Sequence, residues 1–396
     1  MTSRARSRLL GALVVPALLV AACGGGSGSP TGDASAAGAE PVTVGVVTAT
    51  SGALASYGRA YLEGLEAGLD HATDGTGEVG GRPVRLEVVD DAGAPDQAVA
   101  AATELVGRGV KILVGTVSSG VAVQLAPFAE ENDLLYVSGP AAVDAVTGVN
   151  RNTFRSGRQT YQDVAAAASL LADPRGTVLV LGQDTAFGQG NVAAVQAVLG
   201  ARGATVEQLL VPATANDFTP FAQQIRDRAP DLLFVAWAGD TSAAMWQSLQ
   251  QQGVFEATEV TTGLGDRATW PAYGQAPQDI AFLAHYVPGA ADTEADAALR
   301  ERVAEPDLFT PDGFVAAQMV VRALQEGDPE DTASMIEALE GWEFEAPKGT
   351  QTIRASDHAM LQPMFTARLT GTGETRQAEL VEALDADAVA PPEAGQ

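Results

Sequence analysis

Short apolar runs alternate with amphipathic segments through most of the chain, and this alternation limits the fold more than any other feature. The runs expected to form strands lie near residues 42–47, 84–89, 111–115, 134–139, 177–182, 206–211, 231–237, 259–263 and 280–287. Helical segments separate most of them, as where Tyr61, Leu65 and Leu69 recur at every fourth position. Apolar strands that alternate with helices form parallel sheets covered on both faces. The sequence therefore predicts an α/β protein with doubly wound sheets.

The strands fall into two series, which predicts two lobes joined by a hinge with several crossovers. Three helical segments near residues 292–304, 311–327 and 332–340 follow the second series and are expected to return to the first lobe. We therefore expect lobe 1 to comprise residues 42–157 and 287–349, and lobe 2 to comprise 158–286 and 350–381. In open α/β sheets the ligand crevice lies at the carboxyl ends of the strands. The cleft between the lobes is the expected binding site.

Both ends of the chain differ from this pattern. Residues 1–22 carry three arginines and then an apolar run, which is typical of a secretory signal peptide and shorter than the roughly 20 residues that a membrane-spanning helix needs. The run ends before Cys23 in a sequence that resembles the lipobox of bacterial lipoproteins. Residues 23–41 are interpreted as a lipidated Cys23 and a Gly/Ser/Ala-rich flexible tether, with a soluble secreted protein as the alternative. Residues 382–396 are expected to be a disordered acidic tail.

Composition excludes several classes of function. The chain of 396 residues has 50 Asp and Glu against 23 Lys and Arg, a formal net charge of −27. Such a surface repels phosphate backbones, so we expect no nucleic-acid partner. Cys23 is the only cysteine, which excludes an internal disulfide and a Cys-based zinc site. The three histidines are far apart and show no metal-ligand spacing, and no catalytic set is visible. We expect no metal, no cofactor and no enzymatic activity.

Four segments carry a resemblance to a known family. These are VTVGVVTATSGALASYGRAYLEGLEAG, GGRPVRLEVVDDAGAPDQAVAAATELV, ILVGTVSSGVAVQLAPFAEENDLLYVSGPAA and VLGQDTAFGQG. Their order resembles the branched-chain amino-acid (leucine-binding) family, the extracytoplasmic solute-binding proteins of ABC importers, which have the type I periplasmic-binding fold. The similarity extends over about residues 42–370.

The resemblance implies a function, its partners and a site. It implies a lipid-anchored protein on the extracytoplasmic face of the bacterial cell membrane, which binds a small organic solute and delivers it to an ABC permease with separate ATPase subunits. The solute would be an amino acid or a related small carboxylate or amide. The candidate ligand-binding residues are Tyr57, Ser118, Ser119, Ala141, Val143, Phe187, Trp237, Asp240 and Asp266.

The resemblance also implies roles for some of these residues. Ser119 matches the hydroxyl that binds the ligand carboxylate, and the amides of a helix N-terminus beside it favour an anion, although Ser118 and Ser119 could serve only as helix caps. Val143 replaces a threonine of the head-group site, while Phe187 and Asp240 stand where the family has tyrosines. Asp266 aligns loosely with the acid that holds the ligand ammonium group.

Other interpretations stay open at this point. A sensory ectodomain that passes a signal to a membrane receptor would have the same fold, and a lipid-anchored hydrolase is a further possibility. Asp90 and Asp91 could be metal ligands or a catalytic pair, but the end of a strand and the start of a loop explain them more simply. Residues 188–193 match G-x-G-x-x-A, but five residues separate this motif from its strand, which disfavours dinucleotide binding.

Overall fold

The computed structural model describes residues 39–171, 176–274 and 277–394. The signal peptide, Cys23 and most of the tether that the sequence predicts lie outside the described residues. Within those ranges no helix combines the length and the apolar character needed to cross a membrane.

The first sheet forms the centre of lobe 1, with its strands in the order β2-β3-β1-β4-β5-β6. The strands are β1 (Val42–Thr48), β2 (Glu78–Val79), β3 (Arg82–Asp90), β4 (Ile112–Val114), β5 (Leu135–Ser138) and β6 (Thr153–Arg155). All neighbours pair in parallel except β2 and β3. Successive residues of β1 point to opposite faces, so Val46 packs in one core and Val47 in the other.

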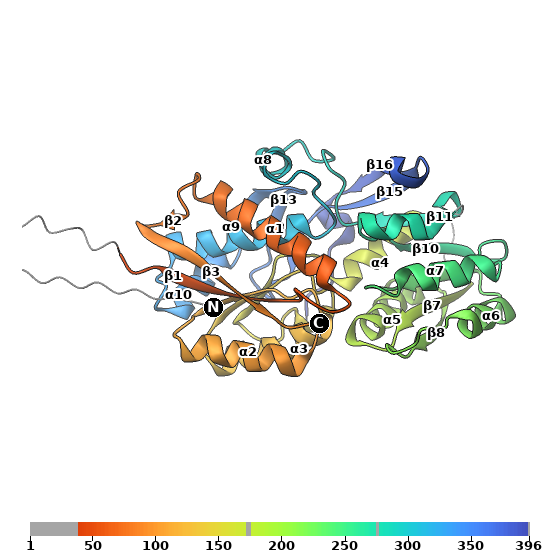
Figure 1. Cartoon of the computed structure of the whole chain (residues 1–396), viewed down its shortest axis with the longest axis horizontal. Helices are drawn as coiled ribbons and strands as arrows, with labels where there is room; N and C mark the ends of the chain where they lie inside the picture. Colours follow the sequence, from red (N-terminus) through yellow and green to blue (C-terminus); the bar gives the residue numbers. More distant parts are fainter. Residues whose placement is uncertain (1–38, 172–175, 275–276, 395–396) are drawn as a thin grey trace, which may run out of the picture. The chain divides into compact units, whose positions relative to one another are not determined.

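Helices cover both faces of this sheet. On the face of Val46 lie α1 (Ala55–Ala72), α9 (Thr310–Glu326) and α10 (Thr332–Leu339). On the face of Val47 lie α2 (Pro95–Gly107) and α3 (Ser119–Glu131). Helices α9 and α10 return to lobe 1 from late in the chain, as the sequence predicts, and Figure 1 shows α9 beside α1.

Glycines allow α1 and α9 to pack at unusually short range. A Cβ added at Gly64 would lie 1.9 Å from the Thr310 carbonyl oxygen, and one added at Gly313 would lie 2.0 Å from the Tyr61 carbonyl oxygen. Both contacts are with backbone atoms, so any larger residue would force the helices apart. The close crossing fixes the start of α9, and therefore Phe309 just before it, against α1.

The second sheet forms the centre of lobe 2, in the order β16-β15-β11-β10-β9-β7-β8. Its strands are β7 (Thr177–Gln183), β8 (Thr205–Val211), β9 (Leu232–Ala236), β10 (Glu259–Gly263), β11 (Ile280–Ala284), β15 (Met364–Thr370) and β16 (Gln377–Leu384). The first five pair in parallel, and β15 and β16 are antiparallel additions.

This sheet is also covered on both faces. Helices α4 (Thr160–Ser169) and α5 (Ala186–Val198) pack on one face, and α6 (Thr219–Arg228) and α7 (Ser242–Gln251) on the other. Figure 1 shows α5, α6 and α7 around strands β7 and β8. The predicted fold class, α/β with two doubly wound, mainly parallel sheets, is confirmed.

The structure corrects one predicted segment boundary. Residues 350–363, which were expected in lobe 2, belong to a small antiparallel sheet with β12 (Glu343–Ala346), β13 (Gly349–Ile353) and β14 (Met360–Leu361). Ile353 and Met360 are buried in the lobe 1 core with α9 and α10. The chain therefore crosses to lobe 2 only at Met364. The run QPMFTARL contains the crossing point, which directly follows Pro363.

The predicted disordered tail is also corrected. After β16 the chain forms the short helix η6 (Ala386–Val389), and Val389 is buried in the core of lobe 2. Arg354 of lobe 1 donates hydrogen bonds to the carbonyl oxygens of Pro391 at 2.8 Å and Pro392 at 3.1 Å. The acidic composition of the tail predicted disorder. Composition does not reveal these contacts, because they are made to main-chain carbonyl oxygens.

Candidate functional site

A cavity of about 440 Å³ lies between loops of the two sheets. Lobe 1 contributes residues that follow β1, β3, β4 and β5, and lobe 2 contributes residues that follow β7, β8, β9 and β10. These are carboxyl ends of parallel strands, where helix N-termini and loops gather in a doubly wound fold. The cavity lies where the sequence predicts the ligand crevice.

Aromatic side chains from both lobes form much of the cavity wall. Tyr57 and Phe309 of lobe 1 meet edge to face, with their ring centroids 5.0 Å apart. Phe187 and Trp237 line the side of lobe 2. Trp237 also packs edge to face on Phe218 at 5.2 Å and donates from Nε1 to Thr241 Oγ1 at 3.1 Å. Trp237 therefore has both roles considered for it, a cavity wall and a packing residue of its own lobe.

Helix α3 points its N-terminus at the cavity. Ser118 is the N-cap residue, and its Oγ accepts a hydrogen bond from Val121 N at 3.5 Å. The amide of Ala122 bonds the Ser118 carbonyl oxygen, which leaves the first-turn amides of Ser119 and Gly120 without an intrahelical acceptor. Ser119 is the first residue of the helix, and its Oγ accepts a hydrogen bond from Val143 N at 3.4 Å. Capping is thus performed by Ser118, and the amides and hydroxyl at Ser119 can hold an anion.

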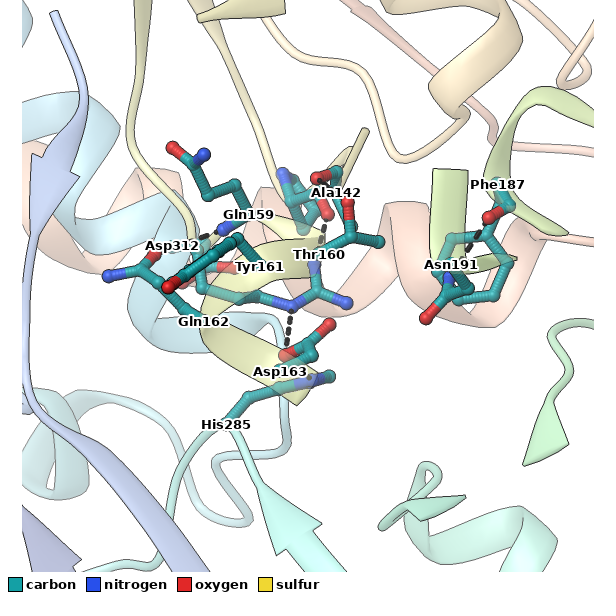
Figure 2. Close-up of polar contacts among 12 residues, drawn as sticks. Ala142, Gln159, Thr160, Tyr161, Gln162, Asp163, Phe187, Asn191, His285 and Asp312 are labelled. Atoms are coloured by element: carbon teal, nitrogen blue, oxygen red, sulfur yellow. Dashed lines mark hydrogen bonds and ion pairs between the residues drawn. The ribbon is translucent and has the colours of Figure 1, made fainter. Parts of the chain in front are cut away.

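Three buried ionisable side chains line the cavity near the crossovers between the lobes. Arg158 donates from Nε to Asp163 Oδ1 at 3.3 Å, and His285 Nε2 lies 3.1 Å from the same oxygen (Figure 2). Burial opposes ionisation of Asp163, but Arg158 and His285 outweigh it and hold the pKa of that carboxyl below its usual value. Burial lowers the pKa of His285, with a smaller contribution from Arg158. His285 is therefore neutral at pH 7 and donates from Nε2, while Nδ1 is buried without a partner among the described residues.

Sequence reasoning missed this charged group and also Asn191, another polar residue of the wall. Asn191 Nδ2 donates to the Phe187 carbonyl oxygen at 2.9 Å, so its Oδ1 points away from that carbonyl (Figure 2). Asp163, His285 and Asn191 are far apart in the chain, and only Asn191 falls in a motif named above, at a variable position of G-x-G-x-x-A. One general rule could have pointed to the charged group: charged residues are seldom buried unless they are paired with a residue of opposite charge.

Six of the nine predicted ligand-binding residues line the cavity. They are Tyr57, Ser118, Ser119, Phe187, Trp237 and Asp240. Asp240 is exposed at its edge. Ala141 and Val143 are buried behind the wall, which their neighbours Pro140 and Ala142 form instead.

Asp266 lies outside the lining. Its Oδ1 accepts from Thr269 N at 3.1 Å and from Thr269 Oγ1, and so caps helix η3 (Arg267–Tyr273). Burial, and then the charge of Asp266, raises the pKa of the Tyr57 hydroxyl, so Asp266 lies near the wall although it is not part of the lining.

Asp90 and Asp91 serve the loop that follows β3. Asp90 Oδ1 accepts from the amides of Thr50 at 2.8 Å and Ala92 at 2.9 Å, and its Oδ2 accepts from Ser51 Oγ. Slight burial of Asp90 acts to raise its pKa, but the hydrogen bonds from Ser51 and these amides outweigh burial and lower the pKa of Asp90 to about 2. Asp91 accepts from Gly93 N at 2.7 Å and from Thr116 Oγ1. In the described ranges no group of three or more His, Cys, Asp or Glu is arranged to hold a metal ion.

The chain matches a family of known proteins over most of its length. Residues 41–374 match the model of a family described as periplasmic binding protein. The chain belongs to the periplasmic binding protein family. This periplasmic binding protein is 28% identical over 331 residues to the Leu/Ile/Val-binding protein homolog 3 of Brucella melitensis biotype 1, which covers 81% of the chain and 89% of that relative.

Solved structures show the same architecture. An ABC-type branched-chain amino acid transporter protein from Rhodopseudomonas palustris has 31% sequence identity and a TM-score of 0.72, covering 89% of this chain and 99% of that chain. A solute-binding protein of an ABC transporter from Rhodopseudomonas palustris HaA2, solved with p-hydroxybenzoic acid, has 21% identity and a TM-score of 0.80, covering 90% and 99%. The resemblance drawn from the sequence is confirmed, and the periplasmic binding protein is a solute-binding protein of the ABC-transporter type.

Proposed function

We propose that this protein is the lipid-anchored receptor of an ABC importer, which binds a small organic solute between its lobes and delivers it to a permease with separate ATPase subunits. The observation that carries the proposal is the cavity itself, because loops from the carboxyl ends of both sheets enclose it. A solute that touches both lobes binds more tightly when they are closed, and this difference in affinity can shift a hinge equilibrium.

The polar groups of lobe 1 suit a carboxylate. The free amides at Ser119 and Gly120 and the Ser119 hydroxyl lie together at the N-terminus of α3. A helix N-terminus carries a partial positive charge, so these groups favour a negative ligand group. The aromatic wall suits an apolar body. A small carboxylate with an apolar body, such as an amino acid or a related organic acid, or its amide, fits both features.

The relatives support transport over sensing. One relative is named for binding leucine, isoleucine and valine, and two structural neighbours are components of ABC transporters, one of them solved with p-hydroxybenzoic acid. Those ligands belong to the relatives, and they define the range of solutes to test here. A sensory ectodomain would bind ligand in the same cavity but would have a membrane receptor as its partner.

The anchor is proposed from the sequence around Cys23, which lies outside the described residues. Two or more acyl chains give stable membrane attachment. The substitution Cys23→Ser should leave an unlipidated precursor or a released protein that still binds its solute. Mass spectrometry of the mature N-terminus tests this: a chain that begins well past Cys23 and carries no acyl mass would exclude the lipoprotein.

A thermal-shift screen of the purified protein tests the binding function. The panel contains amino acids, their deamino analogues, carboxamides and aromatic acids. A ligand at 100 times its Kd stabilises the folded protein by about 2.7 kcal/mol. With an unfolding entropy of roughly 2.1 cal/mol/K per residue for about 350 residues, the melting temperature rises by about 3–4 °C. No shift with any compound, followed by no heat in calorimetry, would refute the proposed function.

A further inference from the structure

The cavity contains a cation that belongs to the protein. Arg158 is only 3% exposed, and its guanidinium carbon lies 5.4 Å from the centre of the Phe309 ring. Its Nε donates to Asp163 and its Nη1 to the Pro140 carbonyl oxygen. Its Nη2 donates to no residue in the part of the chain that the structure describes. A guanidinium is charged at every physiological pH and carries five N–H donors, so Arg158 still has donors to offer a ligand.

Three main-chain acceptors near this cation already accept a hydrogen bond. The Pro140 carbonyl oxygen accepts from Arg158, and the Ala142 carbonyl oxygen accepts from Thr160 N at 2.8 Å. The Val143 carbonyl oxygen accepts from the buried Arg155 at 2.8 Å. An ammonium group has three N–H donors and needs acceptors for them once it leaves water. These three carbonyl groups of the loop therefore offer an ammonium group little.

The carboxylates are no more available to an ammonium group. Asp266 caps η3 and is not part of the cavity lining, and Asp240 is exposed at the edge. Asp163 shares one oxygen between Arg158 and His285, so its charge is balanced by the arginine beside it. A ligand ammonium at Asp163 would also lie close to the Arg158 cation, and two like charges in a desolvated site repel each other strongly.

We infer that the solute is a carboxylate with an apolar body and no α-ammonium group, and that Arg158 contributes to binding its negative charge. Arg158 and Ser119 are bonded to the same loop, at Pro140 and at Val143, so the guanidinium and the N-terminus of α3 lie on one wall. Tyr57, Phe187, Trp237 and Phe309 then enclose the apolar body. This inference rests on the proposed function and narrows its ligand class.

The test is calorimetric titration of the wild-type protein with matched probes. The pairs are 3-phenylpropanoate with phenylalanine, and 4-methylpentanoate with leucine, which differ only in the α-ammonium group. A third probe, 3-phenylpropanamide, lacks the negative charge. Whichever of the two carboxylates binds more tightly should bind at least tenfold more tightly than its amino acid. In the same titrations 3-phenylpropanoate should bind at least tenfold more tightly than 3-phenylpropanamide. If the amino acid binds more tightly, the inference is wrong and the proposed function stands; if no probe or screened solute binds, the proposed function itself fails.

Variants of Arg158 and Asp163 test which side chain determines the preference for a carboxylate without an ammonium group. Arg158→Gln should weaken 3-phenylpropanoate at least tenfold and 3-phenylpropanamide much less. Arg322→Gln removes an arginine that pairs with Glu326 on α9, outside the cavity wall, and is the matched control with wild-type affinity. Asp163→Asn provides the opposite test, because a selective loss of amino-acid binding in this variant would show that Asp163 holds an ammonium group.

Discussion

The hydroxyl of Tyr57 in α1 accepts a hydrogen bond from the amide of Gly239, which follows β9, at 3.5 Å. This bond joins the first helix of lobe 1 to a cavity loop of lobe 2. Gly239 has φ of +87°, and a Cβ at this position would lie 2.9 Å from the Ala53 carbonyl oxygen. The two lobes therefore meet here through backbone atoms, with no room for a side chain.

Gly239→Ala should keep the lobes apart. The added methyl must displace Ala53, and the positive φ adds strain, so we expect weaker ligand binding and a larger radius of gyration in solution scattering of the ligand-saturated protein. Gly109→Ala is the matched control, because Gly109 has φ of +86° and nothing within 4 Å of its Cβ position. If Gly239→Ala and Gly109→Ala have the same ligand affinity and the same radius of gyration, Gly239 does not limit how closely the lobes approach. Tyr57→Phe should have a smaller effect, about 0.5–1.5 kcal/mol at most, since the bond is long.

Ser118→Ala and Ser119→Ala should separate capping from binding. Loss of the Ser118 cap should lower the free energy of unfolding by about 1 kcal/mol with little change in affinity. Loss of the Ser119 hydroxyl should weaken binding of a carboxylate by about 1–3 kcal/mol. It should also lower stability modestly, because the buried Val143 amide loses the long hydrogen bond that it donates to Ser119 Oγ. Denaturant titration and calorimetry measure the two quantities, and the reverse pattern would move the carboxylate site to Ser118.

Trp237→Ala should lower both the stability of the protein and its affinity for the ligand. Trp237 packs on Phe218, and removal of a large buried aromatic side chain costs roughly 3–5 kcal/mol, less here because Trp237 is only partly buried. The same change removes an apolar wall, so affinity for an aromatic acid should fall as well. Phe218→Ala is the control, since it disturbs the packing but not the cavity lining. Equal loss of affinity in both variants would show that Trp237 contributes only through stability.

Removing one partner of the Lys348–Asp312 ion pair should destabilise the protein more than replacing both partners with uncharged residues. Lys348 Nζ lies 3.2 Å from Asp312 Oδ1, and both side chains are fully buried. Lys348→Met leaves the Asp312 charge without its partner and should cost about 3–5 kcal/mol of stability. Lys348→Met combined with Asp312→Asn removes both charges and should recover most of that loss. Urea unfolding of the single and double variants tests this, and a double variant no more stable than the single would contradict it.

His285 should make the protein less stable in mild acid. Its pKa is lowered by burial, so the folded protein keeps the imidazole neutral, while in the unfolded chain it titrates near 6.5. Below about pH 6.5 the unfolded state binds a proton that the folded state does not, and stability falls by at most about 1.4 kcal/mol per pH unit. Asp163, whose pKa is lowered, adds to this only below about pH 4.

The His285 effect is measured as the difference in melting temperature between pH 7.5 and pH 5.5. His285→Gln should reduce this difference in melting temperature. The same pH dependence in wild type and His285→Gln would show that the effect comes from other groups.

The sequence was sufficient for the fold because its signals are local. Continuous β-branched runs such as Val42–Val47 and fourfold spacing such as Tyr61, Leu65 and Leu69 predict buried strands and amphipathic helices. Helix α4 (TYQDVAAAAS) was missed because its N-cap is Gln159, a residue type that pattern rules do not expect at the start of a helix. That omission also hid Asp163, which α4 carries.

The site was predicted only in part, because the missing residues depend on the crossovers. Ser119 and Trp237 follow strands directly, so strand prediction alone brings them to the cleft. Arg158 and His285 lie on two connections between the lobes, and Phe309 on a third stretch of chain. Their meeting depends on how the hinge segments fold together. Asp266 stays a prediction, since its carboxylate caps the helix that follows it and is not part of the cavity lining.

Strand β1 pairs in parallel with β3 from Val42 to Thr48 and with β4 at its centre, and the proposed tether joins the chain just before this strand. A load on the proposed tether would enter at the N-terminal end of β1, a strand that hydrogen bonds to neighbours on both sides hold in the sheet. The cavity residues that follow β1 come after its opposite end, beyond Thr48. The point of attachment and this part of the cavity therefore lie at opposite ends of one strand.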